Sequence, residues 1–295
     1  MPPRNGFWPR ISLVTPSFNQ GTFLERTIQS VLSQRYPNLE YLIMDGGSSD
    51  ESVAIITRYA EQLAHWESQP DKGQSHAINK GFARSTGDIM AWLNADDILL
   101  PNALHAVGQI FRDFPHIQWL TSGSINLDAD DRLFFLQPPQ RYYARWTQFF
   151  NHAPPPQPCT FWRRSLWDQA GGSVTEQSRF MDCELWLRFY EHAPLYIADT
   201  VFGAWRAHPS SYSLQQRAHL HAEIDAAQRP HLARFLDQRW WLKPCTPMLR
   251  RYFARKAATV MRPSASGVVN RLFFEWRVKP HRFLSFDMSS GRFTL

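Results

Sequence analysis

The sequence predicts an α/β protein with a mixed, mainly parallel sheet flanked by helices. Over the first 100 residues, short apolar runs typical of buried strands alternate with stretches whose apolar residues repeat at helical spacing. This order implies right-handed crossovers between parallel strands. Each apolar run ends in polar residues, and the run from Trp92 to Asp97 ends in two adjacent carboxylates. Open α/β sheets bind ligands at the carboxyl ends of their strands, so we expect the functional site there.

The elements of the first part follow one another with short polar turns. Strands are predicted at 11–14, 39–44, 65–68 and 89–93, and helices at 21–34, 50–63, 74–84 and 101–114. Pro101 suits the first turn of the last of these helices, where a missing N–H costs nothing. The first half of the chain is therefore expected to be one continuous β-α-β-α unit.

The second part is less regular. Two strands near 117–126 and 132–137 have the pattern of an antiparallel hairpin, and a helix at 182–191 and strands near 195–205 follow. The proline-rich stretch 137–158 suits either a stiff linker or a loop over a site. From about 213 the pattern is helical and basic. We therefore divide the chain into a domain at 1–212, with halves at about 10–100 and about 101–212, and an extension at 213–295.

Composition and charge narrow the class of protein. The chain has 295 residues, 43% of them hydrophobic, so it can bury a sizeable core. Three widely spaced cysteines indicate neither a disulfide framework nor a zinc site. No signal peptide and no apolar run of membrane-spanning length is recognisable, so we expect a cytoplasmic protein.

The net charge of +6 is unevenly distributed along the chain, because residues 229–295 hold 14 Lys/Arg and 3 Asp/Glu. A basic extension of this kind suits an anionic membrane surface, an anionic acceptor or nucleic acid.

Several motifs occur in an order and spacing that are together highly specific. They are Thr15-Pro-Ser-Phe-Asn19, Asp45-Gly-Gly-Ser-Ser-Asp50, Asp71-Lys-Gly-Gln74, Ala77-Ile-Asn-Lys-Gly81, Gly87-Asp88, Leu93-Asn-Ala-Asp-Asp97, Gln157-Pro-Cys-Thr-Phe-Trp162 and Met181-Asp-Cys-Glu-Leu-Trp-Leu-Arg188. In these residues the chain resembles glycosyltransferase family 2, the inverting nucleotide-sugar glycosyltransferases with the GT-A fold. The resemblance covers roughly residues 10–212, and it implies a GT-A catalytic domain with a nucleotide-sugar half at about 10–100 and an acceptor half at about 101–212.

The resemblance implies a binding site for a nucleotide-sugar donor at the strand ends. Asp45 can accept a hydrogen bond from a uracil N–H or the ribose, although Asp-Gly is also an ordinary turn signal. Ser48 can equally cap the next helix, and Lys72 can serve either the diphosphate or a turn. The residues expected to bind the nucleotide are Thr15, Pro16, Ser17, Asn19, Asp45, Gly47, Ser48, Lys72, Asn94, Ala95 and Asp96.

The resemblance also implies a divalent metal ion, Mg²⁺ or Mn²⁺. Asn94–Asp97 resembles the family's Asp-x-Asp motif, with Asn94 in place of the first acid. Asp96 is the better expected ligand and Asp97 the second, because one or two carboxylates with donor phosphates and waters are the usual way to bind such ions. His208 matches a position where relatives supply a further ligand, although a lone histidine is more often a surface or core residue. The alternative for the two acids is capping of the helix near Pro101.

The acceptor side is expected to carry the catalytic base. The family's acid pair is Met181-Asp182 here, so Asp182 is the expected base and Glu184 the fallback. A carboxylate opposite the leaving diphosphate can remove the acceptor hydroxyl proton, and Asp182 can cap its helix at the same time. Residues expected to contact sugar or acceptor are Phe161, Trp162, Trp186 and Arg188, with a structural role as the alternative for Trp186 and Arg188.

Together these features predict a metal-dependent inverting glycosyltransferase that moves one sugar, most readily from a UDP-linked donor. The family implies a saccharide or lipid-linked saccharide acceptor in surface polysaccharide or glycan synthesis, and no nucleic-acid partner. The basic extension leads to the hypothesis of peripheral contact with an anionic membrane, with a solvated helical face as the alternative. A catalytically dead scaffold is the rival reading, because Asn94 and Met181 replace acids. A sugar-phosphate nucleotidyltransferase is disfavoured because residues 15–21 contain no Arg or Lys.

Overall fold

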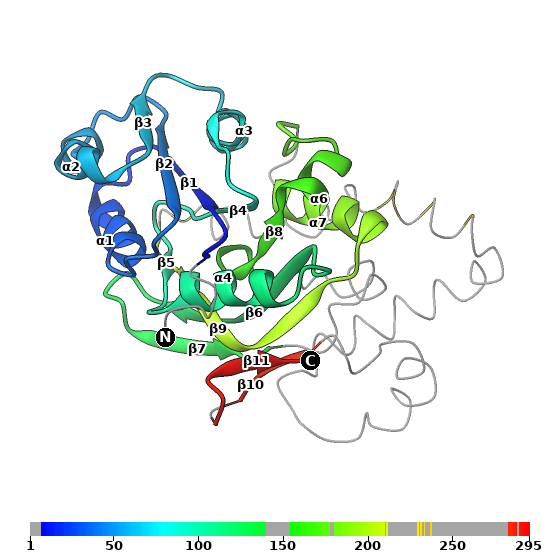
Figure 1. Cartoon of the computed structure of the whole chain (residues 1–295). Helices are drawn as coiled ribbons and strands as arrows, with labels where there is room; N and C mark the ends of the chain where they lie inside the picture. The colour runs from blue at the N-terminus through cyan, green and yellow to red at the C-terminus, as the bar shows by residue number, and fades with distance from the viewer. Residues whose placement is uncertain are drawn as a thin grey trace.

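The computed structural model describes residues 7–139, 154–177, 180–209, 211, four single positions between 229 and 237, 283–287 and 289–295. Within these residues a single mixed sheet of eleven strands runs through the molecule, with helices packed on it (Figure 1). The main path of the sheet has the strand order β11-β10-β9-β6-β8-β4-β1-β2-β3, while β5 pairs with β9 and β7 pairs with β6. The predicted fold class, a mixed sheet flanked by helices, is confirmed.

The first part of the chain forms the predicted β-α-β-α unit, with parallel pairing of β1 with β2, β1 with β4 and β2 with β3. The apolar runs are buried because helices cover the faces of the sheet. The elements in chain order are β1 (Ile11–Ser17), α1 (Gly21–Leu32), β2 (Leu39–Asp45), α2 (Ser52–Tyr59), the 3-10 turn η1 (Ala60–Gln62), β3 (His65–Ser68), α3 (Gln74–Arg84) and β4 (Ile89–Trp92).

Glycine allows α3 to lie close against the sheet. A Cβ atom built on Gly81 would lie 2.5 Å from Val14 Cγ1 and 3.1 Å from Met44 Cγ, so a larger residue would push α3 away from β1 and β2. Val14 and Met44 are themselves buried in the core. This close approach sets the distance of α3, and of the loop before it, from the ends of β1 and β2.

The segment after β4 differs from the prediction. A short strand, β5 (Ile98–Leu99), pairs antiparallel with β9 (Tyr196–Arg206), and α4 (Ala103–Asp113) begins only after it. Pro101 lies in a turn before α4, and Asn102 precedes the helix with a φ of +65°. The prediction of Pro101 as a first-turn residue is wrong because β5 keeps the chain extended as far as Leu99.

The second part adds strands on the β4 side of the sheet. The predicted hairpin is confirmed as β6 (Trp119–Leu127) and β7 (Leu133–Gln137), which pair antiparallel. β8 pairs antiparallel with both β4 and β6, whereas β9 pairs parallel with β6. The remaining elements of this part are η2 (Gln157–Cys159), β8 (Phe161–Arg163), α6 (Arg164–Gln169) and α7 (Met181–His192).

The C-terminal end of the chain returns to the same sheet. β10 (Phe283–Asp287) pairs parallel with β9, and β11 (Arg292–Thr294) pairs antiparallel with β10, so the red strands in Figure 1 extend the edge that β9 begins. Sequence reasoning expected a helical extension here and missed both strands, because they are short. The basic stretch 241–282 lies outside the described residues. So do most of residues 212–240.

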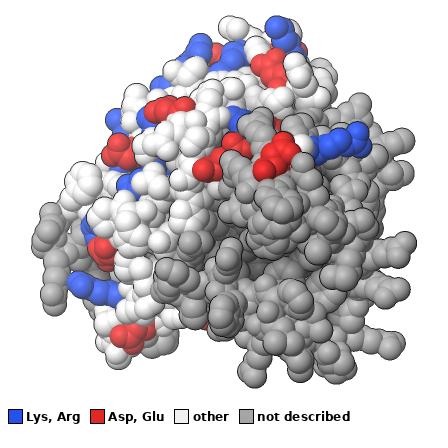
Figure 2. Space-filling view, turned by 90° about the vertical axis from the view of Figure 1, so that its right-hand side faces the viewer, with Lys and Arg blue, Asp and Glu red and all other residues white. Residues whose placement is uncertain are grey.

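Charged residues of both signs are distributed over the described surface. On the face shown in Figure 2, Lys and Arg side chains lie interspersed with Asp and Glu over the described part. The hypothesis of membrane contact concerns the basic extension, most of which lies outside the described residues. Among the residues that the structure does describe, no helix is both long and apolar enough to cross a bilayer.

Candidate functional site

Asp45 organises the loop that follows β2. Its Oδ2 accepts hydrogen bonds from the backbone N–H of Gly47 at 3.1 Å and of Ser48 at 2.8 Å, and from Ser68 Oγ at 2.6 Å, while Ser48 Oγ donates to Oδ1 at 2.5 Å. The carboxylate is almost fully buried. Asp45 therefore shapes the turn, and its role toward a nucleotide stays a prediction.

The loop after β1 lies against this turn. Asn19 is exposed with a φ of +51°, its backbone N–H donates to Ser48 Oγ at 2.8 Å, and its Oδ1 accepts from the backbone N–H of Ser49 at 2.9 Å. Thr15 is buried and its hydroxyl contacts Tyr41 Oη at 3.0 Å. Thr15, Pro16 and Ser17 all lie inside the end of β1, so only Asn19 of the four predicted residues presents its side chain to solvent.

The loop after β3 completes this edge. The Asp71 carboxylate accepts a hydrogen bond from the backbone N–H of Gly73 at 2.7 Å. A Cβ atom built on Gly46 would lie 3.1 Å from Asp71 Oδ2. Gly47 adopts a φ of +82° against Pro70, which explains the two consecutive glycines. Lys72 is exposed at the tip. The structure thus brings the loops after β2 and β3 together, with the exposed Lys72 beside them.

The Asn94–Asp97 turn follows β4 and is tied down from several sides. The hydroxyl of Thr27 on α1 donates to the carbonyl oxygens of Ala95 at 2.8 Å and Asp97 at 2.7 Å. Asn94 Nδ2 donates to Asp97 Oδ2 at 3.1 Å, and Asn94 Oδ1 accepts from Gln74 Nε2 at 2.7 Å. The amide that replaces the family's first acid therefore links α3 to Asp97.

The two aspartates of this turn have different environments. Asp97 is 1% exposed, and its Oδ1 accepts from the backbone N–H of Arg206 at 3.0 Å. Burial, and next the charge of Asp96, raise the pKa of Asp97 well above its usual range. Asp96 keeps about a fifth of its side chain exposed. Both oxygens of Asp97 are occupied by protein donors, so the structure favours Asp96 over Asp97 as the ligand-facing acid.

Asp96 meets His208 across the site. His208 Nε2 lies 3.0 Å from Asp96 Oδ2, although the two residues are 112 positions apart. His208 is buried at the end of β9, and its ring packs against Phe23 of α1 with centroids 4.3 Å apart. Its Nδ1 is buried and has no hydrogen-bond partner among the described residues. The pairing of Asp96 with His208 is one that only the tertiary structure creates.

The donor atoms of this pair suit a divalent metal ion. Asp96 Oδ2 and His208 Nε2 lie within hydrogen-bond distance of each other, 3.0 Å apart. A carboxylate oxygen is a ligand that Mg²⁺ and Mn²⁺ accept, and the imidazole nitrogen beside it could serve as a second ligand. Within the described ranges no group of three or more His, Cys, Asp or Glu side chains forms a metal site. Two protein ligands fit a cation that takes its other ligands from phosphates and water.

Asp182 lies in the first turn of α7. The side chain is partly buried, and Oδ1 accepts from the backbone N–H of Cys183 at 2.8 Å. Burial raises the pKa of Asp182 above its usual range. Trp186, four residues later, stacks on Trp92 of β4 with centroids 5.7 Å apart and an interplanar angle of 14°. Since residues four apart share a helix face, Asp182 lies on the face of α7 that packs Trp186 against β4.

Glu184, the fallback base, is committed to an ion pair. Arg188 Nε lies 2.9 Å from Glu184 Oε1, and its second nitrogen lies 2.8 Å from Oε2. The same guanidinium donates to the carbonyl oxygens of Ala170 and, at 2.7 Å, Ser173. Arg188 therefore holds α7 to the turn after α6, and the contacts favour the structural alternative for it.

The aromatic residues expected on the acceptor side lie in the core. Phe161, Trp162 and Trp186 are all 0% exposed, and the rings of Trp162 and Trp186 pack together with centroids 5.6 Å apart. Their faces are covered by neighbouring side chains, so in this structure no sugar ring reaches them. The indole nitrogens of Trp92, Trp162 and Trp186 are buried without a hydrogen-bond partner in the described part of the chain.

Sequence reasoning missed several residues that build the site. Arg206 and Asp131 support the aspartate turn, Thr27 fixes its backbone, Gln74 binds Asn94 and Phe23 packs on His208. They are spread over α1, α3, β6–β7 and β9, so no local spacing joins them. The run Arg206-Ala-His208 was the one available signal, because a buried strand rarely ends in two basic residues without partners.

The chain is similar to known proteins in sequence and in fold. A family model described as glycosyl transferase family 2 matches residues 12–168. An uncharacterized glycosyltransferase of Mycobacterium tuberculosis is 40% identical over 90 residues, which are 30% of this chain and 34% of the relative. The match thus spans about a third of that relative's length. An uncharacterized glycosyltransferase of Rickettsia typhi is 24% identical over 216 residues, 70% of this chain and 66% of the relative.

Two solved structures share the fold. The mannosyltransferase PcManGT from Pyrobaculum calidifontis, in complex with GDP-Man and Mn²⁺, superposes with a TM-score of 0.59 at 17% identity over 92% of this chain and 83% of its own. TarS residues 1–349 from S. aureus, in complex with UDP-GlcNAc, gives 0.56 at 14% identity over 69% and 60% of the two chains. At these identities the likeness shows the GT-A fold.

Proposed function

This chain belongs to glycosyl transferase family 2, and we propose that it transfers a single sugar from a nucleotide donor to a saccharide or a lipid-linked saccharide. The observation that carries the proposal is the pair of Asp96 and His208, 3.0 Å apart. Asp96 follows β4, and the loops after β1, β2 and β3 end at the same edge of the sheet. An α/β sheet of this kind presents its ligand site there.

We propose UDP as the nucleotide. The related folds were solved with UDP-GlcNAc in one case and GDP-Man in the other, which supports a nucleotide-sugar and leaves the base open. Asn19 and Ser48 are hydrogen-bonded to each other at the ends of β1 and β2, and the buried Asp45 holds Ser48 in place. This arrangement leaves Asn19 exposed, where it suits the base and ribose. Lys72 is exposed at the tip of the neighbouring loop, where its ammonium group suits the diphosphate.

We propose further that Asp96 and His208 hold Mg²⁺ or Mn²⁺ together with the donor's phosphate oxygens. When bound, such an ion offsets the negative charge that develops on the departing diphosphate. Asp97 is not expected to bind it, because its carboxylate oxygens are buried and accept from Arg206 N and Asn94 Nδ2. Asp97 instead holds the turn that presents Asp96.

Asp182 is the proposed catalytic base. The acceptor hydroxyl oxygen attacks the anomeric carbon, the bond from that carbon to the diphosphate oxygen breaks, and the hydroxyl proton passes to Asp182. Attack from the face opposite the leaving group inverts the anomeric configuration. Asp182 suits the task because it is partly buried and has no charged hydrogen-bond partner in the part of the chain that the structure describes, whereas Glu184 is paired with Arg188.

The wider role is proposed from the family alone. It is the synthesis of a surface polysaccharide or glycan in the cell envelope, with the protein in the cytoplasm and in peripheral contact with an anionic membrane through its basic extension. The second candidate is a nucleotide-binding scaffold without catalysis. The replacement of an acid by Asn94 favours that candidate, and the retained Asp96, Asp97 and Asp182 oppose it.

Isothermal titration with UDP and with GDP, each with and without Mn²⁺, tests the proposal. We expect UDP to bind more tightly with Mn²⁺ than without it, and we expect this gain to vanish in Asp96→Ala. Asp130→Ala is the matched control, because that carboxylate is 71% exposed on the nearby hairpin. Binding of neither nucleotide under any condition would count against a glycosyltransferase. Metal-dependent binding without turnover across a broad acceptor panel would favour the scaffold.

A further inference from the structure

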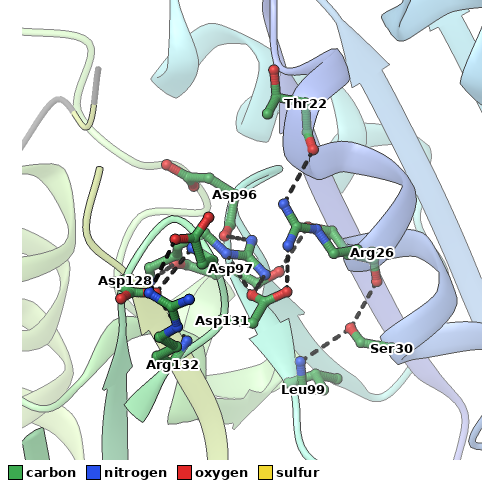
Figure 3. Close-up of polar contacts among 12 residues, drawn as sticks. Thr22, Arg26, Ser30, Asp96, Asp97, Leu99, Asp128, Asp131 and Arg132 are labelled. Carbon is green, nitrogen blue, oxygen red and sulfur yellow. Dashed lines mark hydrogen bonds and ion pairs between the residues drawn. The ribbon is translucent and has the colours of Figure 1, made fainter. Parts of the chain in front are cut away.

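The turn of the β6–β7 hairpin places one carboxylate, that of Asp131, beside the arginine that supports the aspartate turn. Asp131 lies in the hairpin turn with a φ of +65°, and Asp128 shapes this turn by accepting from the backbone N–H groups of Asp130 and Arg132, each at 2.9 Å. Figure 3 shows the Asp131 carboxylate directed toward the aspartate turn and toward Arg26 of α1.

Asp131 binds two arginines from two other elements. Its Oδ1 accepts from Arg206 Nε at 2.9 Å and from a terminal nitrogen of the same guanidinium at 2.5 Å, and its Oδ2 accepts from Arg26 of α1. Partial burial acts in the opposite direction, but the hydrogen bonds and charges of Arg206 and then Arg26 hold the pKa of Asp131 below its usual range. The carboxylate is therefore ionised at neutral pH.

Arg206 connects this carboxylate to the site. Its side chain is 1% exposed, and the other terminal nitrogen of its guanidinium donates to the backbone carbonyl oxygen of Asp96. Its backbone N–H donates to Asp97 Oδ1 at 3.0 Å. Two residues later in the chain, His208 meets the Asp96 side chain. One arginine thus fixes the position of the aspartate turn relative to the end of β9.

A shared aromatic ring completes the cluster. Phe23 of α1 lies under both guanidinium groups, 5.1 Å from that of Arg206 and 5.5 Å from that of Arg26, and it also packs on the His208 ring. A buried guanidinium is stable only while it is paired. Asp131 is the carboxylate that hydrogen-bonds the Arg206 guanidinium, so the orientation of Arg206 depends on the hairpin.

We propose that Asp131 is a positioning residue, which acts through Arg206 to hold Asp96 beside His208, where both side chains could bind one divalent cation. This inference rests on the proposed function, because it assigns those two side chains to a metal ion. The proposal gives the β6–β7 hairpin a role in the donor site, although Asp131 is distant in sequence from Asp96 and His208.

Metal dependence of nucleotide binding tests the proposal. In Asp131→Asn we expect the Mn²⁺ concentration for half-maximal UDP binding to rise about tenfold, since the loss of groups that orient metal ligands weakens metal affinity by about 10–100-fold. The affinity for UDP without metal should stay within about twofold. A merely structural role would lower the number of binding sites per chain and leave the half-saturating concentration unchanged. Isothermal titration separates these two quantities.

Matched variants keep the test decisive. Asp130→Asn, on the same turn but 71% exposed, should behave as the unmutated protein. Arg26→Gln removes the second cation from Asp131 at a site that is 39% exposed, and it should raise the half-saturating Mn²⁺ concentration about two- to threefold. Arg26→Gln carries the test alone if Asp131→Asn does not fold.

Two results overturn the proposal, and they differ. If the unmutated protein requires Mn²⁺ and the Asp131 and Arg26 variants show the same half-saturation, Asp131 positions nothing and the proposed function stands. If the unmutated protein binds neither UDP nor GDP in a Mn²⁺-dependent way, the proposed function fails, and the positioning role fails with it.

Discussion

At the scale of single residues, the adjacent acids Asp96 and Asp97 have different roles in the site. Asp97 is buried, and its two carboxylate oxygens accept hydrogen bonds from Arg206 N and Asn94 Nδ2, so it stabilises the turn. Asp96 reaches His208 and keeps part of its side chain exposed. Asn94 makes this division possible, because its amide can donate to Asp97 where a second carboxylate would repel it.

Asp182→Asn is expected to lower kcat by about 10²–10⁴-fold and to leave nucleotide binding intact, as the loss of a general base does. The base must be ionised to accept a proton, and burial raises its pKa. Activity of the unmutated enzyme should therefore rise with pH through that raised pKa. Rate measurements against pH check both points. A variant that keeps the same rising limb would assign the limb to another group.

Asn94→Asp is expected to destabilise the fold, because the new carboxylate would lie at the 3.1 Å distance that now joins Asn94 to Asp97 Oδ2. Two carboxylates in contact raise a pKa, so the folded state would bind more protons than the unfolded chain, and stability would fall as pH rises. Urea unfolding without metal should show a loss of about 1–3 kcal/mol at pH 8 and less at pH 5. An equal loss at both pH values would contradict this explanation.

At the scale of elements, the helices bring the loops to the site. α1 contributes Thr27 to the aspartate turn and Phe23 to His208, and α3 contributes Gln74 to Asn94. α7 is anchored by Trp186 on Trp92. Each helix therefore links its packing on the sheet to one part of the site, and a shift of one helix displaces specific contacts.

Gly81→Ala is expected to destabilise the protein by about 1–2 kcal/mol. Alanine is the better helix former by about 1 kcal/mol, but its Cβ would lie 2.5 Å from Val14 Cγ1, and overpacking of a core costs about 1–3 kcal/mol. Chemical denaturation gives the change in free energy of unfolding. In a Val14→Ala background the same substitution should become neutral or stabilising. A loss of the same size in both backgrounds would exclude the clash as its cause.

At the scale of the whole molecule, one sheet joins the first and the last described strands. β10 extends the edge at β9, and Leu284 of β10 is 0% exposed in the common hydrophobic core. The last described strands therefore share the hydrophobic core of the main sheet. The division of the chain at residue 212 stays a prediction.

Leu284→Ala is expected to lower the free energy of unfolding by about 2–5 kcal/mol, because a buried leucine in a shared core leaves a cavity. Leu295→Ala is the control, since that side chain is 47% exposed and a change there should fall within about 0.5 kcal/mol. Urea unfolding followed by tryptophan fluorescence measures both. An unchanged midpoint for Leu284→Ala would show that the C-terminal strands unfold independently of the main core.

Local patterns in the sequence determined the elements of the first half of the chain and the fold class. Apolar periodicity depends on neighbours along the chain, so it predicted β1 to β4 and the helices between them with small errors at their ends. The resemblance to glycosyltransferase family 2 marked Asp96 and Asp182 as candidates, because both lie within its motifs. Apolar periodicity failed at β5, β10 and β11, which are too short to have a period of their own.

Contacts between distant residues were decided only by the tertiary structure. The pairing of Asp96 with His208 spans 112 positions, and the link from Asp131 to Arg206 spans 75. The burial of Phe161, Trp162 and Trp186 likewise depends on which elements cover them. A sequence states which side chains are present, but the partner of a carboxylate or the cover of a ring is set by the packing of whole elements, and that packing is a property of the folded chain.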